Sequence, residues 1–255
     1  MDPFAHHPEL RPLIADPSQS FLRDLTIAKL ETLMLERGLP GGWWHSDETR
    51  EALRAAFLAS LPPAVAAGDL WIFAYGSLMW DPALMFAEVR RARVEGYARH
   101  FILKDTAGGR GTLDNPGLMA ALDRGAGCDG LAFRIPRPLV ERETEVLWRR
   151  ELVGPAYRAM LLDAVLDDGT VTALSFVADH EAPQIDPDIT RAEQLRCLVH
   201  GTGFLGTSLD YLRKIAAKVA ALGIRDAEIA DLLAEAEAMI AAAPTADPAD
   251  AGGKG

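Results

Sequence analysis

The stretch from Asp69 to Ala178 most constrains the fold, because it consists of short apolar or alternating runs interrupted by Gly, Pro and Asp. Runs of this length between such residues are typical of β-strands. We predict strands over residues 70–75, 89–97, 100–104, 118–123, 130–135, 158–166 and 170–178. The strands come first and helices follow, so the pattern favours an α+β fold with a mixed or closed sheet over a doubly wound α/β fold.

The N-terminal part of the chain is predicted to be helical. A helix over residues 21–37 would stop at the Gly- and Pro-rich residues 38–42. A second helix, capped by Ser46, places Leu53, Phe57 and Leu61 at i, i+4 and i+8, and Pro62-Pro63 would end it. Residues 1–20 are rich in Pro, His and Asp, and we expect a loose lead-in there.

Further helices are predicted in the second half of the chain. One runs from about residue 138 to 152 and must end before Gly154-Pro155. Three others are expected between Thr190 and Gly201, near 208–222, and after a cap at Asp226. The chain is thereby divided into a helical extension over 1–68, a domain with the candidate chemistry over 69–242, and a disordered tail over 243–255.

Charge and cysteine content narrow the class of protein. The formal net charge of −11 argues against nucleic acid or an anionic membrane as a partner, because both attract basic patches. The two cysteines are fewer than a secreted scaffold usually carries. No signal-peptide pattern begins the chain, and no run of about 18 apolar residues could span a membrane. We therefore predict a cytoplasmic protein with reduced thiols.

A turn that could bind an anion follows the first predicted strand. The strand runs directly into Tyr75-Gly76-Ser77-Leu78. A Gly-Ser turn of this kind can point successive backbone N–H groups outward, and a carboxylate would fit such a nest without any Lys or Arg. An ordinary strand-to-loop turn is the alternative interpretation.

Glu151 is the candidate catalytic acid. It shares one face of the 138–152 helix with Val140, Thr144 and Leu147, at i, i+4, i+7 and i+11. Burial and the negative end of the helix would both raise the pKa of this carboxyl group, so that it could accept and donate a proton. Residues expected to face elsewhere are Arg142, Glu145, Arg149 and Arg150. The alternative is a structural ion pair with Arg149, Arg150 or Arg158.

Other segments carry less specific signals. Arg110, in a Gly-rich loop, could bind a carboxylate or could be a solvated residue at a hairpin tip. The Tyr157 hydroxyl could bond a substrate or Glu151, or the ring could simply pack. Residues 203–206 are interpreted as a joint between two helices. The histidines and cysteines show no zinc-site spacing, and no GxSxG, P-loop or GxGxxG motif is present.

The candidate residues described above belong to a series of short motifs. In their order along the chain, over about residues 69–222, these motifs resemble those of the ChaC-type γ-glutamylcyclotransferases. The matching positions are Trp71-Ile72-Phe73-x-Tyr75-Gly76-Ser77-Leu78-Met79-Trp80-x-Pro82, Gly96-Tyr97, Arg99-x-Phe101, Gly108-x-Arg110-Gly111-Thr112, Pro116-Gly117, Gly130-x-Ala132-x-Arg134-x-Pro136, Leu147-Trp148-x-Arg150-Glu151, Tyr157, Leu205-Gly206 and Tyr211-Leu212. The N-terminal helical arm is similar to that of longer bacterial members.

The resemblance implies a small mixed β-barrel flanked by helices. It implies glutathione as substrate, 5-oxoproline and Cys-Gly as products, and neither a metal nor an organic cofactor. The loop Tyr75–Leu78 would bind the substrate, together with Arg110 and Tyr157, and Glu151 would be the catalytic residue. We expect a monomer or weak dimer. Departures from the family pattern at Pro155 and Phe204 concern substrate preference more than reaction type.

Two other functions remain open on the sequence. The first is ring closure on other γ-glutamyl peptides or amines. The second is a non-catalytic regulatory subunit of a cation transport system, which the retained Glu151 and Tyr75–Leu78 loop argue against.

Overall fold

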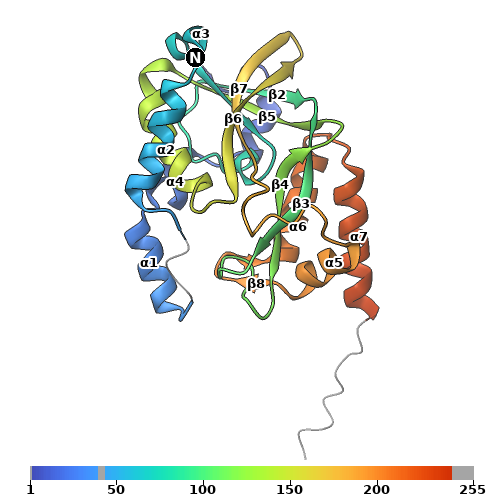
Figure 1. Ribbon diagram of the computed structural model, residues 1–255. Helices are drawn as coiled ribbons and strands as arrows, with labels where there is room; N and C mark the ends of the chain where they lie inside the picture. Colours follow the sequence, from blue (N-terminus) through green and yellow to red (C-terminus); the bar gives the residue numbers. More distant parts are fainter. Residues whose placement is uncertain (1, 40–43, 243–255) are drawn as a thin grey trace, which may run out of the picture.

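The computed structural model describes residues 2–39 and 44–242 (Figure 1). The predicted disordered tail over 243–255 lies outside the described residues. Within the described part, strands form a central sheet with helices on its flanks (Figure 1). None of the described helices is long and apolar enough to cross a membrane.

All seven predicted strands are present, with boundaries that differ by a few residues. They are β1 (Leu70–Ala74), β2 (Glu88–Val94), β3 (Tyr97–Asp105), β4 (Gly117–Arg124), β5 (Cys128–Ile135), β6 (Tyr157–Leu166) and β7 (Gly169–Ala178). Their order in the sheet is β1-β5-β2-β6-β7-β4-β3, and β1 also pairs with β7. The β1–β7 pairing is parallel, with Ile72 opposite Leu174. It closes β1, β5, β2, β6 and β7 into a small barrel, which confirms the mixed, closed sheet.

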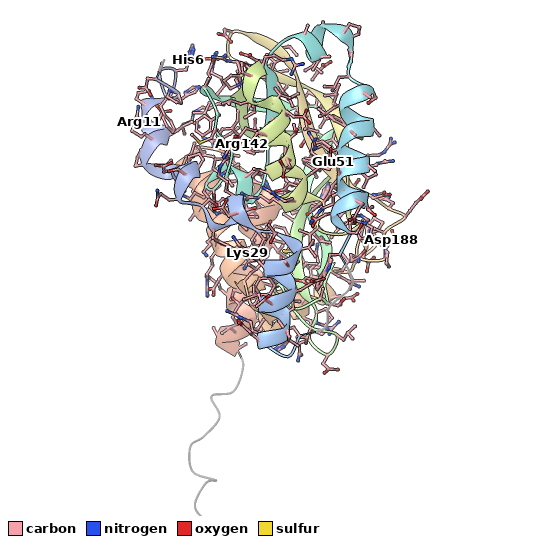
Figure 2. All side chains as sticks on the ribbon, turned by 90° about the vertical axis from the view of Figure 1, so that its left-hand side faces the viewer. His6, Arg11, Lys29, Glu51, Arg142 and Asp188 are labelled. Carbon is pink, nitrogen blue, oxygen red and sulfur yellow. The ribbon has the colours of Figure 1, made fainter. Side chains whose placement is uncertain are left out.

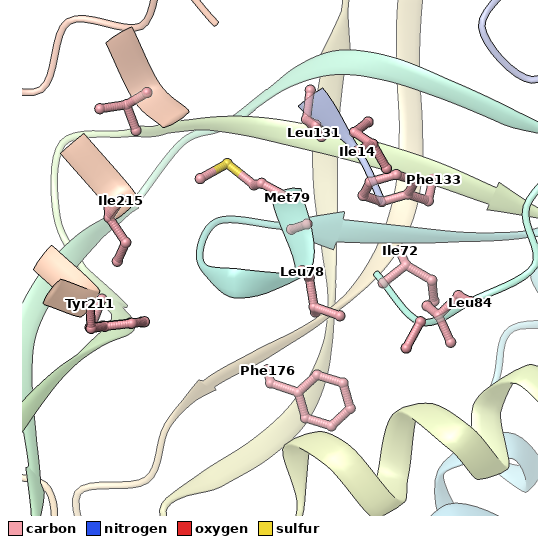
Figure 3. Close-up of a cluster of buried hydrophobic side chains, with 14 of the residues drawn as sticks. Ile14, Ile72, Leu78, Met79, Leu84, Leu131, Phe133, Phe176, Tyr211 and Ile215 are labelled. Carbon is pink, nitrogen blue, oxygen red and sulfur yellow. The ribbon is translucent and has the colours of Figure 1, made fainter. Parts of the chain in front are cut away.

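The barrel is narrow because small side chains occupy part of its interior. Ala132, Ala164 and Ala173 are fully buried in one apolar cluster with Phe73. A larger cluster lies between the sheet and the flanking helices (Figure 3). Leu78, Met79 and Tyr211 meet in this second cluster, so the turn after β1 is anchored in the core.

The helices of the second half agree with the predicted boundaries. They are α4 (Val140–Glu151), preceded by a 3-10 turn at Arg137–Leu139, then α5 (Arg191–His200), α6 (Ser208–Ala221) and α7 (Ala227–Ala242). Thr190 caps α5 by accepting the N–H of Glu193, and Asp226 caps α7 by accepting the N–H of Ile229. The predicted joint at 203–206 is a short hairpin of β8 (Thr202–Gly203) and β9 (Gly206–Thr207).

The N-terminal extension is more closely attached to the sheet than we expected from the sequence. It contains 3-10 turns at Pro8–Leu13, Pro17–Gln19 and Phe21–Asp24, then α1 (Ile27–Glu36), α2 (Asp47–Ala59) and α3 (Pro63–Ala67). The expected helix over 21–37 is therefore a 3-10 turn followed by a shorter α-helix. The loose lead-in is wrong, because Leu10 is fully buried in the main core and the Ala15 N–H donates to the Trp80 carbonyl at 2.8 Å.

Helix α2 presents a different face to the protein from the one its apolar spacing suggested. Leu53 is 43% exposed, whereas Arg50 and Arg54 are buried. Arg54 donates to the Thr144 hydroxyl of α4 and to the Glu141 carboxylate. Phe57 keeps its apolar role, with its ring centroid 5.3 Å from that of Trp148. The interface between α2 and α4 therefore contains both polar contacts of Arg54 and an aromatic contact of Phe57.

Candidate active site

The turn at Tyr75–Leu78 leaves β1 and continues into a 3-10 turn, η4 (Ser77–Met79). Its carbonyl groups are used inside the turn, since the Met79 N–H donates to Gly76 at 3.0 Å and the Asp81 N–H donates to Ser77 at 3.0 Å. Among the described residues, the N–H groups of Gly76, Ser77 and Leu78 find no acceptor. The turn therefore has three successive N–H groups available to an acceptor such as a carboxylate.

Glu151 is the last residue of α4, and only 15% of its side chain is exposed. Val140, Thr144 and Leu147 are buried on the same face of the helix, as predicted. Burial raises the pKa of the Glu151 carboxyl group above its ordinary value, and the adjacent Arg150 guanidinium partly opposes that rise. A carboxyl group whose pKa is raised holds a proton more readily than an exposed one, as a group that both accepts and donates a proton must.

Arg150 connects Glu151 to the turn. Its Nε donates to Oε1 of Glu151 at 3.0 Å, and its Nη2 donates to the Ser77 hydroxyl at 2.9 Å. Its Nη1 donates to the Asp81 carbonyl. The expectation that Arg150 faces away from the core is wrong, since its side chain is 5% exposed. Because Arg150 lies at the end of α4, its long side chain can extend back to the Asp81 carbonyl. The ion pair between Arg150 and Glu151 and the raised pKa of Glu151 therefore occur together.

Three tyrosines, Tyr75, Tyr157 and Tyr211, lie close enough to Glu151 for its charge to affect their pKa values. The Tyr75 and Tyr157 hydroxyl groups are close enough to influence each other's pKa, and Tyr157 donates to the Ala120 carbonyl at 3.1 Å. Burial raises the pKa values of Tyr75 and Tyr157 well above normal and that of Tyr211 to about 12, and the Glu151 charge adds to each rise. The three hydroxyls therefore stay protonated and can donate hydrogen bonds.

Tyr211 was not among the predicted site residues. Its hydroxyl lies beside Gly76, 3.6 Å from where a Cβ atom on that residue would stand. The sequence contains one signal for it, because Tyr211-Leu212 is part of the ordered motif set. On sequence alone, its position in a buried helical stripe is equally consistent with simple packing.

Arg110 lies on the far side of Tyr211, with its guanidinium carbon 4.7 Å from the ring centroid. Its Nη1 donates to the carbonyls of Leu205 at 2.9 Å and Thr207 at 3.2 Å. The hairpin at 203–206 also binds the Gly-rich loop, because the Phe204 N–H donates to Gly108 at 2.8 Å. Arg110 is thus a fixed residue close to the tyrosines rather than a solvated one.

Arg99 supports the turn from behind. It is buried, and its Nε donates to the carbonyl of Tyr75 at 2.5 Å. It also donates to the Asp129 carbonyl and pairs with Asp226, which caps α7. The sequence singled it out as part of a motif but assigned no role to it. Among the described residues, no group of three or more His, Cys, Asp or Glu side chains is placed to hold a metal ion.

Comparison with known proteins gives one family. The model of the ChaC-like protein family matches residues 70–239. The glutathione-specific gamma-glutamylcyclotransferase of Escherichia coli (strain K12) is 40% identical over 198 residues, which are 77% of this chain and 84% of the relative. The glutathione-specific gamma-glutamylcyclotransferase 1 of Mus musculus is 32% identical over 170 residues, 62% of this chain and 74% of the relative.

Solved structures agree on the fold. The crystal structure of a γ-glutamyl cyclotransferase specific to glutathione from yeast matches with a TM-score of 0.61 at 19% identity. The match covers 67% of this chain and 96% of the yeast chain. At this identity the likeness supports the shared barrel and its flanking helices.

Proposed function

This chain belongs to the ChaC-like protein family, and we infer that it is an enzyme, a glutathione-specific γ-glutamylcyclotransferase. It cleaves glutathione into 5-oxoproline and Cys-Gly. The observation that carries this function is the 40% identity with the E. coli enzyme over most of both chains. The arrangement of Glu151 beside the Tyr75–Leu78 turn is consistent with it.

The γ-glutamyl group of glutathione would bind through its α-carboxylate. The N–H groups of Gly76, Ser77 and Leu78 supply donors for that carboxylate. Arg110 lies across Tyr211 from this turn, where its positive charge favours an anionic substrate. The Tyr157 hydroxyl donates to the Ala120 carbonyl, so as a substrate-binding group it would exchange this acceptor for a substrate oxygen.

Glu151 would act first as a base and then as an acid. It removes a proton from the α-ammonium group, and the freed amine attacks the γ-carbonyl carbon of the same glutamyl unit. A new C–N bond closes the five-membered ring, and the bond to the cysteine nitrogen breaks. The protonated Glu151 donates its proton to that nitrogen as the bond breaks. The carboxylate then takes the second proton from the ring nitrogen and passes it to the released amine, so Cys-Gly leaves as an ammonium and no water is consumed.

The site has little to do beyond folding the substrate and stabilising its charge. The nucleophile and the electrophile are in one molecule, so correct orientation supplies much of the rate acceleration. The protonated hydroxyls of Tyr75 and Tyr211 offer donors to the oxyanion that develops on the γ-carbonyl oxygen. Burial raises the pKa of Glu151 above its ordinary value, which favours a carboxyl group that both accepts and donates a proton.

The direct test is mass-spectrometric detection of products from the purified full-length protein. With glutathione we expect 5-oxoproline and Cys-Gly in equal amounts. With γ-glutamyl-alanine we expect far slower release of 5-oxoproline. Equal rates on the two substrates would contradict glutathione specificity, and no 5-oxoproline from either would contradict the reaction.

The enzyme is proposed to work in the cytoplasm as a monomer or weak dimer. The supporting observations are its substrate and its two cysteines, Cys128 and Cys197, which are both free and buried. Light scattering across a range of concentrations tests the oligomeric state, and a stable higher oligomer would contradict it.

A further inference from the structure

A second polar site lies between α2 of the N-terminal extension and α4, outside the group of residues around Glu151. A cavity of about 260 Å³ is present there, lined by side chains of both helices. Figure 2 shows α2 and α4 side by side, with Glu51 labelled between them. Trp148 and Arg149, which line the cavity, immediately precede the Arg150-Glu151 pair on α4.

Three buried N–H donors around this cavity have no acceptor within the part of the chain that the structure describes. They are Nε1 of Trp148 and the Nε atoms of Arg50 and Arg149. Trp148 is 1% exposed and Arg50 is 3% exposed. An unpaired buried donor destabilises the folded state, so donors of this kind normally have a partner. Since all three missing partners are acceptors, a ligand that satisfies these donors must supply hydrogen-bond acceptors, such as the oxygens of a carboxylate.

The charges that line the cavity are separated by depth. The guanidinium groups of Arg50 and Arg54 are buried, and each pairs with an acid on its own helix, Asp47 and Glu51. Arg149 pairs with Glu145 at 2.8 Å. These three carboxylates are all more than half exposed, so negative charge surrounds the opening while positive charge lies deeper.

This separation decides the class of ligand. The lining holds three arginines and three acids, so a simple anion would have to displace a carboxylate from its arginine. A zwitterion has a negative group that suits the buried arginines and a positive group that suits the exposed carboxylates. Its carboxylate would turn inward to the unpaired donors, and its ammonium group would remain among the acids at the opening.

We propose that the cavity between α2 and α4 binds a small zwitterion of amino-acid to dipeptide size. The carboxylate accepts from Trp148, Arg50 and Arg149, and the ammonium group lies near Glu51 and Glu145. All three donors are buried in the empty protein, so binding includes a rotation of the two arginine side chains that also opens the Trp148 indole N–H to the cavity. The site requires the N-terminal extension, because α2 supplies one of its walls.

The test uses the full-length protein with ¹⁵N-labelled tryptophan and three probes: glycylglycine, acetate and methylammonium. The indole N–H signal of Trp148 is assigned by its loss in Trp148→Phe. We expect glycylglycine to shift that signal saturably with a Kd of about 1 mM or tighter. Acetate and methylammonium should each bind at least about tenfold more weakly, because each lacks one of the two charges.

Matched variants locate the binding. Arg50→Met and Arg149→Met should each weaken glycylglycine binding about tenfold, since each removes a donor. Arg142→Met, an exposed arginine of the same helix, should leave it unchanged. Circular dichroism checks that each variant is folded, and two independent variants keep the test valid if one is not. The proposal is overturned if the Trp148 signal shows no saturable shift, if acetate binds as tightly as glycylglycine, or if Arg142→Met weakens binding as much as the other two.

Discussion

The Nη2 atom of Arg150 lies 2.9 Å from the Ser77 hydroxyl, and this contact couples the end of α4 to the turn after β1. Through the same guanidinium, Ser77 is linked to the carboxylate of Glu151, 3.0 Å from Nε. The residue that would move the proton and the turn that would hold the substrate are therefore fixed relative to each other by one buried side chain. The first two predictions follow from this link.

Glu151→Gln should lower turnover at least about 100-fold, because the amide keeps the shape of the side chain but cannot shuttle a proton. Release of Cys-Gly from glutathione measures the effect, and circular dichroism should show an unchanged fold. The matched control is Glu145→Gln, an exposed carboxylate on the same helix. Near-normal turnover in Glu151→Gln would remove this residue from the proposed role.

Arg150→Met should move the acidic limb of the pH profile of kcat/KM to higher pH. Burial raises the pKa of Glu151 and the Arg150 charge opposes that rise, so removing the charge leaves the pKa higher still. The carboxylate form, which the first proton transfer needs, then appears only at higher pH. The position of this limb is determined by measuring kcat/KM from about pH 5 to about pH 9, with Arg142→Met as the control. An unmoved limb would mean that Arg150 has only a structural role.

Glu143→Gln should destabilise the protein by about 3 kcal/mol, because it leaves a largely buried arginine without its counter-charge. Both oxygens of Glu143 accept from Arg23 at 2.6 Å, and one also accepts the Met85 N–H at 2.9 Å. Urea unfolding measures the change in the free energy of unfolding. Glu141→Gln removes an exposed acid from the same helix and should cost less than about 1 kcal/mol. Equal costs would show that the extension is not held by this pair.

The contact between His100 and Glu228 should stabilise α7 most at low pH. Nδ1 of His100 lies 2.9 Å from Oε2 of Glu228, and this hydrogen bond raises the pKa of the histidine. A group whose pKa is higher in the folded state contributes its full stability below its unfolded value, about pH 6.5, and loses it as the pH rises through the folded value. The difference in the free energy of unfolding between wild type and His100→Gln should therefore shrink as the pH rises from about 6 to about 9. This window begins just below the ordinary histidine pKa of about 6.5. A constant difference would contradict this account.

The sheet was predictable because each strand has a local signature. The runs between Asp69 and Ala178 are separated by turn residues, and each run contains a strand, although β3 (Tyr97–Asp105) is longer than the predicted 100–104 and β2 ends at Val94 rather than residue 97. The closing contact between β1 and β7 was not derivable from spacing, because a parallel pairing of distant strands leaves no mark on either one. The closed barrel was expected from the resemblance to a family.

The largely buried position of Glu151 was predictable for a similar reason, since an acid on a stripe of buried residues is visible at helical spacing. Arg150 was not, because spacing gives the direction of a Cα–Cβ bond and not the path of a long flexible side chain. The buried Arg50 and Arg54 of α2 escaped for the same reason. The packed residues 1–20 were missed because their short 3-10 turns lack a 3.6-residue repeat.

The closure of the barrel by β1 and β7 affects the order in which the protein can fold during its synthesis. Ile72 and Leu174 pair although about 100 residues separate them along the chain, and contacts of such long range form slowly. During synthesis the edge of β1 that pairs with β7 would therefore remain unpaired until β7 has emerged from the ribosome. The turn that follows β1 would acquire its final shape only then, so a truncated product ending before β7 would have no activity to release into the cell.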